Sequence, residues 1–227
     1  MLAFSRVSAG FDGVPVLHDI SFEVPEGETV ALFGHNGAGK TTLLRCAVGD
    51  VSDITGHVSY RQEAIAPGAV FRNTRRGIGF VPQGHNVFRD LTVRQNLTIA
   101  GLHQGDAQVE DIYRQFPILH ERSGQPAGSL SGGQQQILAL GMALMTRPSI
   151  LLLDEPSTGL APIIVRDVMN SLARINKETG TTVVIVEQNV PATLAIASRA
   201  LVLKAGRLVF DGSARALERK ESLWALF

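Results

Sequence analysis

Residues 29–44 read TVALFGHNGAGKTTLL, and this stretch predicts the centre of the fold. Four apolar residues, 30–33, lead into a glycine-rich turn, which a Lys-Thr-Thr run follows. The spacing G-x-x-x-x-G-K-T is typical of a loop that wraps around a phosphate chain. A short apolar run before glycines indicates a buried strand, and the leucines at 43 and 44 continue as a helix. The sequence therefore predicts a strand, a phosphate-binding loop and a helix in succession.

The residue types in this loop suit a nucleoside triphosphate with Mg²⁺. The glycines permit backbone dihedrals that a side chain would forbid, so that loop N–H groups converge on an anion beside the positive end of the helix. Lys40 would supply a point charge to the β- and γ-phosphates, and the hydroxyl of Thr41 would ligate Mg²⁺. An ordinary glycine-rich turn is the alternative, and the complete motif disfavours it. The expected contacts with the nucleotide are Gly34, His35, Asn36, Gly37, Ala38, Gly39, Lys40, Thr41 and Thr42.

The composition limits the possible classes of protein. The chain has 227 residues, 44% of them hydrophobic, which allows one large core or one core with a smaller satellite. Basic and acidic residues number 21 each, and this balance argues against bulk nucleic-acid binding. A single cysteine, Cys46, excludes an intrachain disulfide and is expected to be a buried apolar residue. No apolar run reaches the roughly 18 residues of a membrane span, and the N-terminus does not resemble a secretion signal. We therefore expect a soluble cytoplasmic protein that reaches a membrane only through a partner.

Strands alternate with helices on both sides of a mostly helical block at residues 91–146. This alternation predicts an α/β nucleotide-binding core with a helical insertion. Strands are expected at 2–7, 18–24, 30–33, 57–60, 77–81, 150–155 and 182–186, a hairpin at 200–211, helices at 69–76 and 163–179, and a turn at 52–56. Thr92 is a suitable N-cap for a helix at 93–100. The apolar tail at 223–227 is expected to pack on its own domain.

Two acidic residues follow the apolar run at 150–153. In a protein with a phosphate-binding loop, the first acid after such a strand, Asp154, holds Mg²⁺. The next acid, Glu155, can polarise a water molecule for attack on the γ-phosphorus. The alternative is an acid pair at the start of a helix with no chemical role, and the complete phosphate-binding loop disfavours it.

Two further features bear on nucleotide binding. Ser131, Gly132 and Gly133 begin a helix, where exposed N–H groups and a hydroxyl form a second site suited to an anion. Phe11 lies in the loop expected between the first two strands, where its ring could stack on an adenine. Position alone favours simple core or loop packing for Phe11.

With these motifs in view, the sequence resembles the ATP-binding cassette (ABC) family over essentially its whole length. GHNGAGKTT resembles the Walker A loop, Pro82-Gln83 the Q-loop, LSGGQ at 130–134 the signature, LLLDEP at 151–156 Walker B, and 157–161 the D-loop. Phe11 falls where the family places its adenine-stacking aromatic residue. The resemblance implies a P-loop NTPase core with a mixed sheet at about 1–84 and 149–227, and a helical subdomain at about 85–148.

The resemblance also implies site roles and one departure. Glu155 would be the catalytic base, and Gln83 would reach Mg²⁺ or the water from a loop that senses the membrane partner. Metal contacts would come from Thr41, Gln83 and Asp154. The family usually has a histidine after the last core strand, and Gln188 stands there instead. Because an amide donates a hydrogen bond but cannot become a cation, we expect a weaker γ-phosphate contact.

In this family two cassettes pair head to tail, so Ser131, Gly132, Gly133 and Gln134 of one chain would contact ATP held by the other. The second cassette could be identical or different, and both would bind transmembrane permease subunits at the cytoplasmic face of the inner membrane. GLAP at 159–162 and EQN at 187–189 are similar to importer subunits for branched-chain amino acids or for urea and short amides, which also depend on a substrate-binding protein. The alternatives are export of a lipid or glycolipid, a soluble cassette acting on nucleic acid or the ribosome, and a nucleotide-sensing module.

Overall fold

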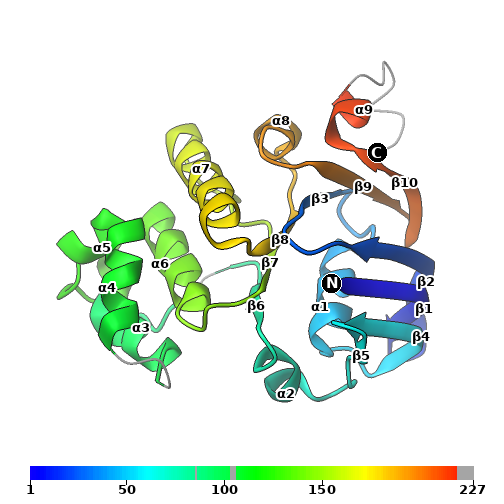
Figure 1. Cartoon of the computed structure of the whole chain (residues 1–227), viewed down its shortest axis with the longest axis horizontal. Helices are drawn as coiled ribbons and strands as arrows, with labels where there is room; N and C mark the ends of the chain where they lie inside the picture. The colour runs from blue at the N-terminus through cyan, green and yellow to red at the C-terminus, as the bar shows by residue number, and fades with distance from the viewer. Residues whose placement is uncertain (85, 103–105, 219–227) are drawn as a thin grey trace.

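The structure is a computed structural model that describes residues 1–84, 86–102 and 106–218. A six-stranded sheet runs through the centre of the molecule in the order β10-β9-β3-β8-β7-β6 (Figure 1). Its strands are β3 (Thr29–Phe33), β6 (Ile78–Val81), β7 (Ile150–Asp154), β8 (Thr182–Val186), β9 (Arg199–Lys204) and β10 (Arg207–Ser213). Neighbouring strands from β9 to β6 pair in parallel, whereas β10 pairs antiparallel with β9. The expected mixed sheet and the hairpin near its edge are confirmed.

A second, four-stranded antiparallel sheet has the order β2-β1-β4-β5. It contains β1 (Leu2–Phe11), β2 (Val14–Val24), β4 (Asp53–Tyr60) and β5 (Glu63–Ala64). The turn expected at 52–56 is wrong, because β4 begins at Asp53 and pairs with β1 from there. Gly56 (φ +78°) lies at an irregularity in that pairing, where a Cβ would meet the carbonyl oxygen of Arg6. A bulge thus lets residues that are typical of turns continue a strand.

The helices fall into two groups. In Figure 1, α3 (Val93–Ala100), α4 (Asp106–Gln115), α5 (Pro117–Glu121) and α6 (Gly132–Leu144) gather at one end, where the sequence predicted a helical block. The others are α1 (Lys40–Val48), α2 (Val70–Thr74), α7 (Pro162–Thr179), α8 (Val190–Leu194) and α9 (Ala214–Glu218), with a 3₁₀ turn at Ala127–Ser129. Thr92 caps α3 as expected and forms a capping box with Gln95.

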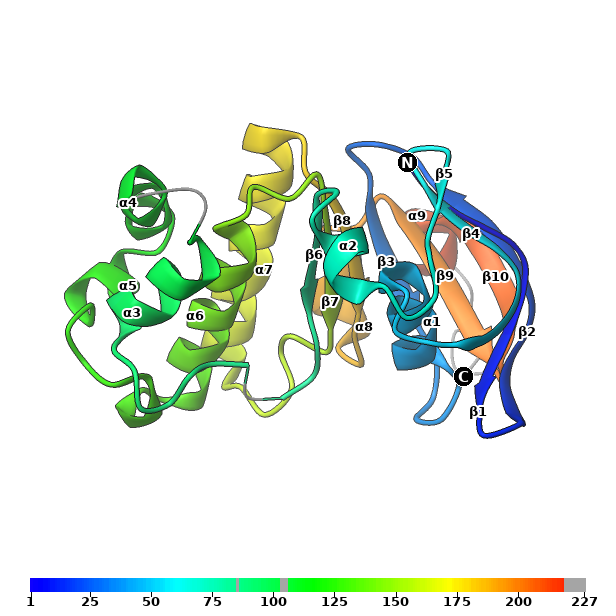
Figure 2. The same cartoon turned by 90° about the horizontal axis from the view of Figure 1, so that it is seen from below.

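The six-stranded sheet separates two hydrophobic cores. Residues alternate along each strand, so one face of the sheet packs on α1 and the other on α6 and α7. Val30, Leu32, Leu152, Val184 and Val186 join the first core, and Leu151, Leu153, Val183 and Ile185 join the second. Figure 2 shows α1 lying between the two sheets. Cys46 on this helix is 1% exposed, and burial raises the pKa of its thiol to about 12, which agrees with the expected structural role.

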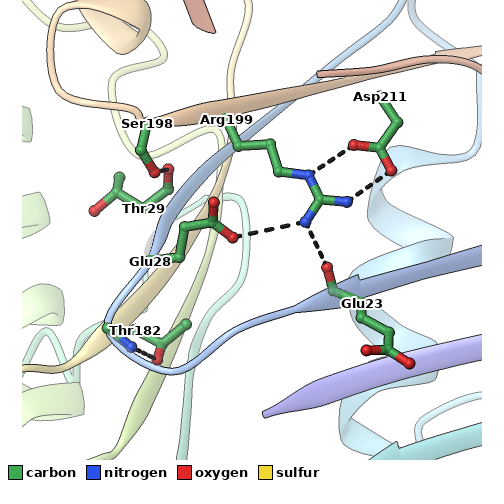
Figure 3. Close-up of polar contacts among 8 residues, drawn as sticks. Glu23, Glu28, Thr29, Thr182, Ser198, Arg199 and Asp211 are labelled. Atoms are coloured by element: carbon green, nitrogen blue, oxygen red, sulfur yellow. Dashed lines mark hydrogen bonds and ion pairs between the residues drawn. The ribbon is translucent and has the colours of Figure 1, made fainter. Parts of the chain in front are cut away.

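A polar cluster joins the strands at the end of the sheet opposite the phosphate-binding loop (Figure 3). Arg199 donates two hydrogen bonds to Asp211, of 2.6 and 2.7 Å, which join β9 to β10. The same guanidinium donates to the carbonyl oxygen of Glu23 in β2 at 2.8 Å and pairs with Glu28 at 3.7 Å. Bidentate pairing with a carboxylate has a fixed geometry, so Asp211 orients the guanidinium, whose hydrogen bond to Glu23 links the second sheet to the first.

Two expectations from the sequence concern the chain as a whole. Within the described ranges, no helix is both long and apolar enough to cross a membrane. The apolar tail at 223–227 lies outside the described residues, so its expected packing stays a prediction.

Candidate active site

The phosphate-binding loop joins β3 to α1 as the sequence predicted. Gly39 has φ +102° and an added Cβ would lie 2.6 Å from Leu17, while at Gly34 (φ +151°) it would meet the carbonyl oxygen of Leu203. Only glycine satisfies both the dihedrals and the space at these two positions. Gly39 also occupies the N-cap position of α1 and provides no side-chain cap. The first N–H groups of α1 are therefore open to an anion.

Lys40 begins α1, and its side chain folds back over the loop. The ammonium donates to the carbonyl oxygens of Gly34 at 2.8 Å and His35 at 3.1 Å, and the residue is 5% exposed. Burial lowers the pKa of Lys40, and the nearby charges of Glu155 and Asp154 oppose this effect. The loop thus carries a desolvated cation beside its open N–H groups, which is an arrangement that favours phosphate.

Asp154 ends β7, and it is 1% exposed. Both of its carboxylate oxygens are buried without a hydrogen-bond partner. Burial raises its pKa, although the hydroxyl of Thr41, which is close enough to favour the charged form, and the charge of Lys40 oppose this. Two unpartnered oxygens beside a hydroxyl suit a hard cation such as Mg²⁺. Within the described ranges, no group of three His, Cys, Asp or Glu residues could hold a metal ion.

Glu155 follows Asp154 directly, and its carboxylate accepts hydrogen bonds from three neutral donors. Gln83 donates to Oε2 at 2.8 Å, Thr158 to Oε2 at 3.0 Å, and Gln188 to Oε1 at 2.9 Å. Gln188 also donates to Asn36 of the phosphate-binding loop at 3.2 Å. These bonds fix the orientation of the carboxylate and add no positive charge of their own. A carboxylate held in this way keeps lone pairs that can accept a proton from water.

The backbone at Glu155 is strained. Its φ is +49°, in the left-handed region that a non-glycine residue adopts at a cost of about 1–2 kcal/mol. The N–H of Glu155 donates to the carbonyl oxygen of Val186 at 2.9 Å, and its own carbonyl accepts from Thr158 at 3.2 Å. These two bonds hold the strained turn, which directs the side chain toward the phosphate-binding loop.

A cavity of about 330 Å³ brings half of the predicted site residues together. Its lining consists of Val16, Asn36, Gly37, Gly39, Lys40, Thr41, Thr42, Gln83, Glu155 and Gln188. These residues come from five segments that lie far apart in the sequence. Sequence reasoning missed Val16 and Thr158. Thr158 carries a weak signal, because a hydroxyl three residues after an acid can reach back to it.

The remaining predicted residues lie outside this cavity. Ser131 caps α6: its hydroxyl oxygen accepts from the N–H of Gln134 at 3.3 Å, and its own N–H donates to Gln134 Oε1 at 3.1 Å. Both side chains are therefore engaged within α6. An added Cβ at Gly133 would lie 2.7 Å from Ile164 of α7, which explains that glycine by packing. Phe11 is the last residue of β1, so the expectation that it lies in a loop is wrong. Its ring is 37% exposed, and the guanidinium of Arg45 lies 5.1 Å from the ring centroid.

A larger cleft of about 750 Å³ lies between α4, the end of α6 and the end of α7. It is rich in arginines, but Arg61 pairs with Glu26, and Arg114 and Arg147 both pair with Asp111. Because these cations already have acidic partners, the cleft offers a ligand less than the phosphate-binding loop does.

Comparison with known proteins agrees with this geometry. Residues 17–158 match the ABC transporter family. The high-affinity branched-chain amino acid transport ATP-binding protein BraG of Pseudomonas aeruginosa is 42% identical over 221 residues, which cover 96% of this chain and 94% of that protein. The lipopolysaccharide export system ATP-binding protein LptB of Escherichia coli K12 is 33% identical over 219 residues, which cover 93% of this chain and 90% of that protein.

The fold also matches solved structures. A dimeric ATP-binding cassette in a post-hydrolysis state with ADP and phosphate has a TM-score of 0.83 at 24% identity, covering 95% of this chain and 99% of that one. This likeness concerns the fold. The family match over more than half of the chain, together with a relative that is 42% identical over nearly all of it, shows that this protein belongs to the ABC transporter family as an ATP-binding subunit with ATPase activity.

Proposed function

We propose that this chain is the ATP-hydrolysing subunit of an importer for branched-chain amino acids, or for urea and short amides. The observation that carries the proposal is the neutral cage around Glu155, formed by Gln83, Thr158 and Gln188 beside the phosphate-binding loop. These three donors hold Glu155 in place, so that its carboxylate can serve as the base for ATP hydrolysis. The substrate class rests on the likeness to BraG, at 42% identity, and on the GLAP and EQN segments. Export of a lipid or glycolipid is the second candidate, supported by 33% identity to LptB.

ATP would bind with its phosphates on the loop between β3 and α1. The N–H groups of the loop and the ammonium of Lys40 would contact the β- and γ-phosphates. Asp154 and Thr41, with Gln83 nearby, would hold Mg²⁺, which when bound neutralises phosphate charge. Phe11 would offer the ring face that Arg45 leaves free to the adenine. The loop N–H groups, Lys40 and Mg²⁺ would place donors and cations against phosphate oxygens, whose charge the transition state spreads over several atoms.

Hydrolysis would proceed by attack of water on the γ-phosphorus. Glu155 accepts one proton of the water while the oxygen forms its bond to phosphorus. The bond from the γ-phosphorus to the bridging oxygen breaks, and its electron pair leaves on ADP. Gln188 bridges the base to Asn36 of the loop, so it fixes the base relative to the phosphates. As an amide it supplies a hydrogen bond without a positive charge.

A second cassette would complete the site. Ser131 and Gly132 are exposed and lie away from the cavity of their own chain. In a head-to-tail pair, the start of α6 would meet the γ-phosphate bound by the partner, with contributions from Gly133 and Gln134. The second cassette would be a copy of this chain or a different subunit. The pair would bind two transmembrane permease subunits on the cytoplasmic side, fed by a substrate-binding protein.

The partners test the proposed function. We expect this chain, when affinity-purified from detergent-solubilised membranes, to bring down two polytopic membrane proteins and a cassette subunit, identified by mass spectrometry. A binding protein encoded with them can then be screened for branched-chain amino acids, urea and amides. Partners dedicated to lipid export would support the second candidate. Ribosomal or nucleic-acid-associated partners alone would contradict both.

Lys40→Ala should weaken ATP binding by about 10- to 100-fold, because charge-assisted hydrogen bonds contribute about 1.5–3 kcal/mol each. Isothermal titration with ATP and Mg²⁺ measures the change. Lys177→Ala is the matched control, since Lys177 is an exposed lysine in the last turn of α7. Equal affinity for wild type and Lys40→Ala would remove Lys40 from the phosphate contact.

Glu155→Gln should preserve ATP binding and lower kcat by at least about 100-fold, because an amide is a far weaker base than a carboxylate. Steady-state phosphate release and ATP titration separate the two effects. The variant should also accumulate as an ATP-stabilised dimer, detected by light scattering. Turnover at the wild-type rate would assign the base to another group.

Gln188→His should tighten ATP binding below pH 6.5, where an imidazole near the γ-phosphate becomes a cation, and should leave it near the wild-type value at pH 8. We expect about a 3- to 10-fold gain at low pH, since charged donors form hydrogen bonds about twice as strong as neutral ones. Titrations at matched pH against wild type cancel the ionisation of ATP itself. Gln136→His on α6 serves as the control, and an equal gain there would contradict a local effect.

A further inference from the structure

Glu187 is a buried acid that the proposed mechanism does not yet use. It follows β8 directly and is 2% exposed. Its Oε1 accepts a hydrogen bond from the backbone N–H of Ser157 at 2.7 Å. Its Oε2 accepts from the N–H groups of Gln188 at 3.1 Å and Asn189 at 3.5 Å. One carboxylate therefore joins the loop after β7 to the loop after β8.

The two anchored loops each provide one of the donors to Glu155. Ser157 precedes Thr158, whose hydroxyl donates to Glu155 Oε2 at 3.0 Å. Gln188 itself donates its side-chain amide to Glu155 Oε1 at 2.9 Å. Glu187 thus fixes the backbone from which both donors extend. Its own side chain does not line the cavity, so it would act through them and not on the nucleotide.

The chemistry at this position requires a carboxylate. Burying an acid is costly unless hydrogen bonds replace its lost water, and three backbone N–H groups do so here. A glutamine of the same shape keeps one acceptor oxygen and turns an NH₂ group toward N–H donors on the other side. One of the two loops would then lose its anchor.

We propose that Glu187 is a positioning residue for ATP hydrolysis, which orients the base Glu155 by holding Thr158 and Gln188 in place. This inference rests on the proposed role of Glu155. Glu187→Gln should lower kcat about 10- to 100-fold, since small displacements of reacting groups have effects of that size. The KM for ATP should stay within about twofold of wild type. Among the described residues, Glu187 forms no hydrogen bond with Lys40 or with the phosphate-binding loop.

The kinetics are measured in the membrane complex with which the chain co-purifies. Glu28→Gln is the matched control, because it removes a half-buried acid contact, the ion pair with Arg199, at the opposite ends of the strands of the same sheet (Figure 3). The control should alter thermal stability more than kcat. Glu187→Asp keeps the charge but is one methylene shorter, so it should fold and show a smaller loss of kcat. Wild-type kcat in both Glu187 variants would overturn the proposal.

A double variant separates positioning from general damage. If Glu187 acts only through Glu155, then Glu187→Gln should not lower the residual rate of Glu155→Gln any further. An equal fractional loss in both backgrounds would overturn the proposal. Wild-type turnover of Glu155→Gln alone would instead refute the proposed base.

Hydrogen–deuterium exchange of the isolated chain tests the anchor without any turnover. The peptide from the loop that loses its anchor, which contains either Ser157 or Gln188, should exchange at least about tenfold faster in Glu187→Gln than in wild type and Glu28→Gln, because its amide loses its acceptor. Unchanged exchange in both peptides would show that Glu187 does not hold the loops.

Discussion

Parallel pairing of β3, β8, β7 and β6 places the carboxyl ends of four strands at one edge of the sheet. The phosphate-binding loop follows β3, Gln83 follows β6, the acid pair ends β7, and Glu187 and Gln188 follow β8. Because both faces of a parallel sheet are covered, the loops must emerge at the two ends of the strands. Groups separated by more than a hundred residues therefore meet in one cavity, and the two hydrophobic cores hold them there.

This edge concentrates buried charge, and most of these charged groups form hydrogen bonds. Lys40 donates to carbonyl oxygens of its own loop. Glu155 and Glu187 accept hydrogen bonds from neutral donors. Asp154 is the exception, because its two buried oxygens have no hydrogen-bond partner. Since an unpartnered buried carboxylate is costly, that position is the one where a metal ion would relieve the largest penalty.

Much of this edge could be predicted from the sequence. The glycines of the phosphate-binding loop, Lys40 and the acids after β7 have fixed spacings, because each must meet a phosphate or a metal from a backbone of fixed geometry. Apolar runs predicted β3, β7 and β8, since buried parallel strands have no alternation to obscure them. The loop at 34–42 could therefore be assigned before its three-dimensional setting was known.

What could not be predicted depends on contacts between segments. Asp53, Thr55 and Gly56 are turn formers, and only pairing with β1 makes them a strand. The sequence predicts a loop at Phe11, because β1 reaches that residue only through its pairing with β2 and β4. Glu187 looks like any acid after a strand, and its three bonds to two loops arise only when β7 and β8 lie side by side.

The described cavity has donors from the loop after β3 and from the loops around Glu155, while the start of α6 is exposed elsewhere. The capping box on α6 engages the side chains of Ser131 and Gln134 with each other, which holds the first turn in a helical form before any ligand arrives. A preformed turn loses little entropy on meeting phosphate. If a second cassette brings such a turn to the cavity, ATP joins two surfaces that are already ordered, and its hydrolysis removes the γ-phosphate that links them. The position of Glu155 would then determine how long the two cassettes stay together.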